Sequence, residues 1–96
     1  MRLISQDGLV DVSYENVLLL IYDGDRAVVI KAYDSVSSDD FVCMGVYETF
    51  KKAESVMKMM REEYKKFATA TNDDDFYEFF DNPKVFQFPA DDEVKV

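Results

Sequence analysis

The chain has 96 residues, of which 48% are hydrophobic and 15% aromatic; this composition suits one packed domain over residues 1–96 and excludes a disordered chain. It contains no histidine and one cysteine, which excludes an intramolecular disulfide framework, the common zinc sites and a nucleophile activated by histidine. The formal net charge of −9 should repel nucleic acid and anionic membrane surfaces.

Two β-hairpins are predicted in the first third of the chain, at residues 2–12 and 16–33. Each contains an Asp-Gly pair, at 7–8 and 23–24, where glycine tolerates the positive φ of a tight turn. The run 17–22 is apolar at every position. It predicts a central strand that is covered on both faces, or one whose second face lies at an interface.

Residues 41–47 predict the next strand, with Gly45 at a bulge or at a point of close packing against a helix. Cys43 lies within this apolar run. Because free cysteine is among the most buried residue types, we expect it to be a small buried hydrophobe and not a reactive thiol.

A long amphipathic helix follows, with Thr49 as its expected N-cap. One apolar stripe recurs at spacings of three and four, through Phe50, Ala53, Val56, Met57, Met60, Tyr64 and Phe67. We expect this stripe to pack on the sheet. Met59 falls beside the stripe and should be partly exposed.

Residues 71–83 combine three successive aspartates with phenylalanines. Asn72 can cap a short second helix whose first turn holds the aspartates, which the helix dipole stabilises there. The segment lacks the glycine and the ligand spacing of an EF-hand. Its exposed side is the candidate docking surface, with Asp74, Tyr77 and Glu78 as the predicted partner-binding residues.

Residues 84–89 alternate in polarity and predict a last strand at a sheet edge, because Pro89 cannot continue a ladder; a charged tail follows. Strands followed by helices favour an α+β fold. We expect an antiparallel β-sheet of about four to six strands, with the long helix packed on one face and a short second helix.

No catalytic, cofactor or metal site is predicted. The carboxylate groups at 23–25 and 39–40 lie in turns that should be exposed, where solvation keeps carboxylates from acid–base work.

The segments MRLISQDGLVDVSYENV, VYETFKKAESVMKMMREEY and VFQFPADDEV resemble a group of short phage-encoded and prophage-encoded proteins of Gram-positive bacteria. The resemblance implies a phage accessory protein in the bacterial cytoplasm. It implies no reaction, cofactor or functional residue.

The favoured hypothesis is a non-enzymatic accessory protein that acts through protein–protein contacts, with a protein partner or by self-association as a homodimer, and that binds neither nucleic acid nor membrane. One alternative is an acidic inhibitor that mimics nucleic acid and blocks a host nucleic-acid enzyme or defence system. A second alternative is a small enzyme with a carboxylate or lysine site.

Overall fold

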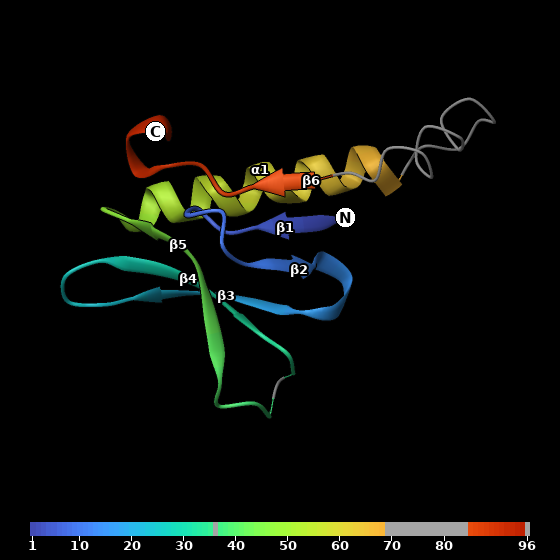
Figure 1. The fold of residues 1–96 in the computed structure, drawn as a ribbon. Coiled ribbons are helices and arrows are strands. Elements are labelled where there is room, and N and C mark those ends of the chain that lie inside the picture. The colour runs from blue at the N-terminus through green and yellow to red at the C-terminus, as the bar shows by residue number, and fades with distance from the viewer. Residues whose placement is uncertain (36, 69–84, 96) are drawn as a thin grey trace.

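A computed structural model describes residues 1–35, 37–68 and 85–95, and shows an α+β fold (Figure 1). The side chains of residues 67 and 68 lie outside that description. The described elements are β1 (Arg2–Ile4), β2 (Asp11–Ser13), the 3₁₀ helix η1 (Tyr14–Asn16), β3 (Leu18–Asp23), β4 (Val28–Tyr33), β5 (Phe41–Tyr47), α1 (Phe50–Ala68), β6 (Val85–Gln87) and the 3₁₀ helix η2 (Asp91–Glu93).

The strands form two three-stranded sheets, in the orders β2-β1-β6 and β3-β4-β5. Leu3 of β1 lies opposite Val12 in the antiparallel pair with β2, and opposite Phe86 in the parallel pair with β6. The predicted single antiparallel sheet of about four to six strands is therefore wrong in size and partly in direction. A parallel pair needs a long connection between its two strands, and β2 to β5 and α1 lie between β1 and β6 in the chain.

Both predicted hairpins are confirmed, as β1–β2 and β3–β4. Gly8, in the first turn, has a φ of 78°, the left-handed conformation that glycine adopts without strain. The turn after β3 is closed by the Gly24 amide, which donates to the Ala27 carbonyl at 3.1 Å.

The central strand of the second sheet is β4, not β3. On β4, Val28, Ile30 and Ala32 are buried toward the core. β3 is an edge strand, and its side chains Leu18 and Leu20 are exposed. The predicted central strand at residues 17–22, covered on both faces, is thus wrong, and the alternative with one face at an interface stays a prediction.

Helix α1 lies across one face of the β3-β4-β5 sheet (Figure 1). The amide of Lys52 donates to Thr49 Oγ1 at 3.2 Å, which confirms the predicted N-cap. The predicted stripe supplies the core, with Ala53, Val56 and Met60 buried. Phe50, which the stripe also included, is exposed, as is Met59.

A β-bulge interrupts β5 where Ile30 pairs with Gly45 and Lys31 pairs with Cys43. The ring of Tyr47 lies so close to Gly45 that an added Cβ there would stand 2.7 Å from the ring. The predicted bulge is confirmed, and the close neighbour of this glycine is a tyrosine ring. Cys43 is exposed, so its predicted burial is wrong.

The C-terminal segment is packed against the domain and is not only a charged tail. Val94 is buried, and Tyr47 Oη donates to the Pro89 carbonyl at 2.8 Å. β6 is an edge strand, as predicted. The predicted second helix lies outside the described residues.

Candidate binding surface

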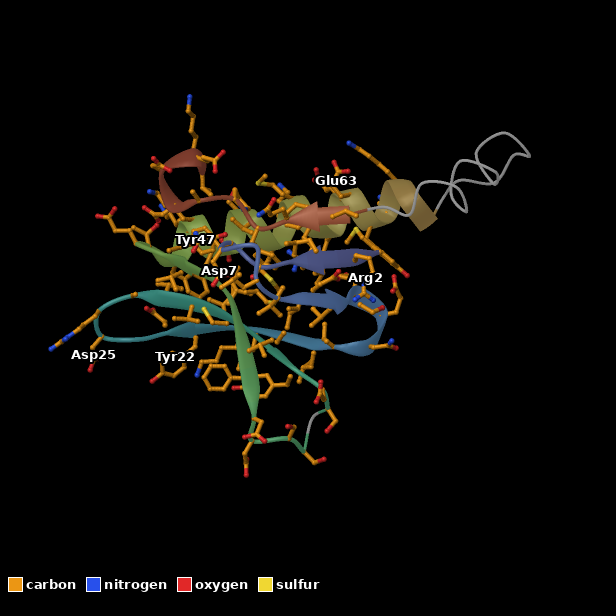
Figure 2. All side chains as sticks on the ribbon, in the orientation of Figure 1. Arg2, Asp7, Tyr22, Asp25, Tyr47 and Glu63 are labelled. Carbon is orange, nitrogen blue, oxygen red and sulfur yellow. The ribbon has the colours of Figure 1, made fainter. Side chains whose placement is uncertain are left out.

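The β3-β4-β5 sheet has one face toward the core and one face toward solvent. Since side chains alternate along a strand, the residues between the buried positions of β4 project away from α1. The strand register aligns them in three rows, which we call the outer face: Leu18, Tyr33 and Phe41; Leu20, Lys31 and Cys43; Tyr22, Val29 and Val46. Figure 2 shows Tyr22 on the side of the sheet away from α1, and Tyr47 on the side toward α1.

Eight of these nine residues are apolar or aromatic. Leu18, Leu20, Tyr22, Phe41 and Val46 are each between 42% and 52% exposed. Single exposed apolar side chains are ordinary, but a contiguous group on one face marks an interaction surface.

Lys31 lies at the centre of the outer face, and its ammonium group is held by aromatic rings. Its Nζ is 4.0 Å from the ring centroid of Tyr22 and 4.1 Å from that of Phe41. Both distances suit cation–π attraction. The ring of Tyr33 packs against Phe41 at a centroid distance of 5.7 Å. Within the described chain, Lys31 Nζ has no hydrogen-bonding or ion-pair partner.

Exposed acidic residues lie at the two ends of the outer face. They are Asp23 at the end of β3, Asp25 in the following turn, which also holds the exposed Arg26, and Asp34, Asp39 and Asp40 between β4 and β5. The outer face therefore combines apolar side chains, one central cation and acidic residues at its ends. A phosphate backbone would meet repulsion from those acidic residues.

The two edges of this sheet differ. The β5 edge is occupied by the chain's own groups: the Gln6 amide donates to the Met44 carbonyl at 2.7 Å, and the Gln6 side chain bonds Val46 N at 3.1 Å and Val46 O at 3.2 Å. Just beyond β5, Asp91 Oδ1 accepts from the Glu48 amide at 2.7 Å. Among the described residues, no group bonds to the outer edge of β3.

Metal-binding and nucleophilic groups are few among the described residues. These residues contain no cluster of histidine, cysteine, aspartate or glutamate able to hold a metal ion. They contain no buried side-chain nitrogen or oxygen without a partner. Partial desolvation of the Cys43 thiol raises its pKa, which lowers the fraction of nucleophilic thiolate at neutral pH.

The predicted partner-binding residues Asp74, Tyr77 and Glu78 lie outside the described residues, so that hypothesis stays a prediction. The sequence analysis allowed for an interface on the second face of residues 17–22, but it did not single out Lys31 or the rest of the outer face. Two signals were present: the uninterrupted apolar run at 17–22, and the mixed composition of β4, where Val29, Lys31 and Tyr33 share one face.

No protein-family model, curated protein or solved structure shows significant similarity to this chain. No helix within the described residues is both long enough and apolar enough to span a membrane.

Proposed function

We propose that this chain is a non-enzymatic accessory protein that works by binding other proteins through the outer face of the β3-β4-β5 sheet. The resemblance to phage and prophage proteins suggests the bacterial cytoplasm as its place of action. The observation that carries the proposal is the group of half-exposed apolar side chains around Lys31.

The chemistry of this surface defines the partner it would fit. Aromatic and aliphatic side chains favour an apolar protein surface, which they would desolvate on contact. The N–H groups of Lys31 would then need an acceptor, because a buried ammonium without one is costly. The expected partner therefore presents a carboxylate or a backbone carbonyl within an apolar surface.

The nucleic-acid mimic is the weaker alternative. Four of the described carboxylates are already paired with cations: Asp11 with Arg2, Glu15 with the N-terminal amine, Asp91 with Lys52, and Glu63 with Lys66. Neutralised carboxylates lose the unpaired negative charge that a phosphate mimic needs.

The test compares proteins captured from a bacterial lysate by the wild type and by two variants, with quantitative mass spectrometry. Lys31→Glu reverses the central charge of the outer face. Leu9→Ser is the control, because Leu9 is 85% exposed and lies in the β1–β2 turn, outside the β3-β4-β5 sheet. Circular dichroism first establishes that both variants fold.

We expect specific proteins that the wild type and Leu9→Ser capture equally and that Lys31→Glu captures at least about 10-fold less, the effect of losing one buried charged contact. If the wild type and Lys31→Glu capture equal amounts of these proteins, the result would contradict the proposal. If the captured proteins are all nucleic-acid enzymes, and Lys31→Glu does not change the amount captured, the nucleic-acid mimic is favoured instead.

A further inference from the structure

We propose that one partner is a second copy of this chain, joined by antiparallel pairing of β3 with β3 across a two-fold axis. The two sheets would become one six-stranded sheet, in the order β5-β4-β3-β3-β4-β5. This inference rests on the proposed function in naming one partner, but it concerns the sheet edge and has its own test.

The two edges of the β3-β4-β5 sheet differ in whether a further strand could pair with them. Gln6 and the β5 bulge block pairing at β5. The first five residues of β3, Leu18 to Tyr22, contain no proline and no charge, and the pairing of β3 with β4 has no bulge, so this stretch lacks these three features that prevent edge pairing. With six residues, β3 is twice as long as the edge strands of the other sheet, β2 and β6.

β3 is also complementary to itself, as a two-fold contact requires. In the register that places Leu20 opposite Leu20 of the second copy, Leu18 lies opposite Tyr22 and Leu19 opposite Ile21. All five cross-strand pairs are then apolar. Asp23 falls opposite Val17, so no like charges meet, and such apolar pairs stabilise sheets.

The charge of Lys31 favours edge pairing over stacking of two outer faces. Stacking about a two-fold axis through the central row would bring two ammonium groups together within an apolar interface, which is costly. Edge pairing leaves β4 and its copy three strand spacings apart, or about 14 Å. Solvent and salt screen charges at that distance.

Edge pairing would also double the candidate binding surface. Opposite residues of an antiparallel pair lie on the same face, so the two outer faces would adjoin on one side of the joined sheet. Each half keeps its own Lys31 available to a further partner.

The first experiment measures the mass of the purified full chain by light scattering after size exclusion, over a range of concentrations. We expect a particle of twice the 11.1 kDa chain mass. Leu20→Lys places like charges directly opposite each other at the axis, and we expect it to raise the dissociation constant about 10- to 100-fold. Val46→Lys is the control, because Val46 is similarly exposed on the same face but lies at the blocked edge; it should leave the dimer intact.

The second experiment reads the register by cysteine cross-linking in a Cys43→Ser background. Leu20→Cys should form an intermolecular disulfide, since opposite residues have Cα atoms about 5 Å apart. Leu18→Cys should not, because the two copies of residue 18 would lie about 13 Å apart along the strands. This readout does not depend on Leu20→Lys remaining folded.

Three results would overturn the inference. They are a monomer at every concentration, equal loss of the dimer in Leu20→Lys and Val46→Lys, and cross-linking at residue 18 as efficient as at residue 20. Because lysate capture is measured separately, a monomer that still captures partners through Lys31 would refute the dimer and leave the proposed function standing.

Discussion

Tyr47 connects two parts of the core that are far apart in sequence. Its ring covers Gly45, and its hydroxyl reaches the carbonyl of Pro89 in the C-terminal segment. The side chain is 1% exposed, and its burial raises the pKa of the phenol well above the ordinary value near 10. Because this buried phenol must stay neutral, the free energy of unfolding should fall at alkaline pH.

Replacing Tyr47 by phenylalanine should change that dependence. Below about pH 10 the phenol is protonated in both states and adds no slope. At higher pH the unfolded chain releases the proton while the folded chain retains it, so the free energy of unfolding falls by about 1.4 kcal/mol per pH unit. Tyr47→Phe lacks this loss, but at neutral pH it costs about 1 kcal/mol through the missing hydrogen bond.

Urea unfolding at about pH 8 and about pH 11 measures both effects. The remaining tyrosines and the lysines are common to the two proteins, so the difference between their pH slopes isolates position 47. Equal alkaline slopes in the wild type and Tyr47→Phe would contradict the buried neutral phenol.

At the scale of elements, η2 is held to β5 and α1 through Asp91. Its carboxylate accepts from the Glu48 amide at 2.7 Å, and its second oxygen lies 3.1 Å from Lys52 Nζ. The backbone hydrogen bond from Glu48, followed by the bond from Lys52, lowers the pKa of Asp91 below its ordinary value. A group with a lowered pKa contributes stability above its unfolded value, near 3.8, and the contribution is lost as the pH falls through the folded value.

We therefore expect Asp91→Ala to lower the urea midpoint at neutral pH, and the difference from the wild type to shrink below about pH 4. Asp92→Ala is the matched control, since Asp92 is an exposed neighbour in the same 3₁₀ helix. Equal effects of the two substitutions, or a difference unchanged by acid, would show that the contacts of Asp91 do not hold the segment.

The elements whose signals are local could be predicted from the sequence. Gly8 marks a turn because of its own backbone freedom, and Thr49 caps a helix through a residue three positions away. The grouping of strands into two sheets could not be predicted, because it depends on distant contacts such as that of Gln6 with Val46, 40 positions apart.

The outer face could be predicted only as one of two alternatives, for a related reason. An apolar run such as residues 17–22 looks the same in a central strand as in an edge strand with one exposed face. The bulge also explains why Cys43 is exposed and not buried. In a regular strand, residues 43 and 47 would lie on the same face. The extra residue of the bulge turns Cys43 outward and leaves Tyr47 in the core.

At the scale of the whole molecule, net charge opposes the proposed dimer. Each copy carries −9, and the acidic turns around the outer face add to the field between two copies. The β3 contact itself is apolar and contains no ion pair, so long-range repulsion is the main electrostatic contribution to its free energy. The effect of salt on dimer formation therefore has a defined sign.

Raising the ionic strength should tighten the dimer. Between about 0.01 M and about 0.1 M salt the screening length falls from roughly 30 Å to roughly 10 Å, which weakens repulsion between the copies and leaves the apolar pairs of β3 unaffected. Sedimentation equilibrium of the wild type across this range should give a dissociation constant that decreases with sodium chloride, while Leu20→Lys stays largely monomeric. If the copies were instead held by Lys31 of one and an acidic turn of the other, screening would weaken the contact, and the dissociation constant would increase with salt.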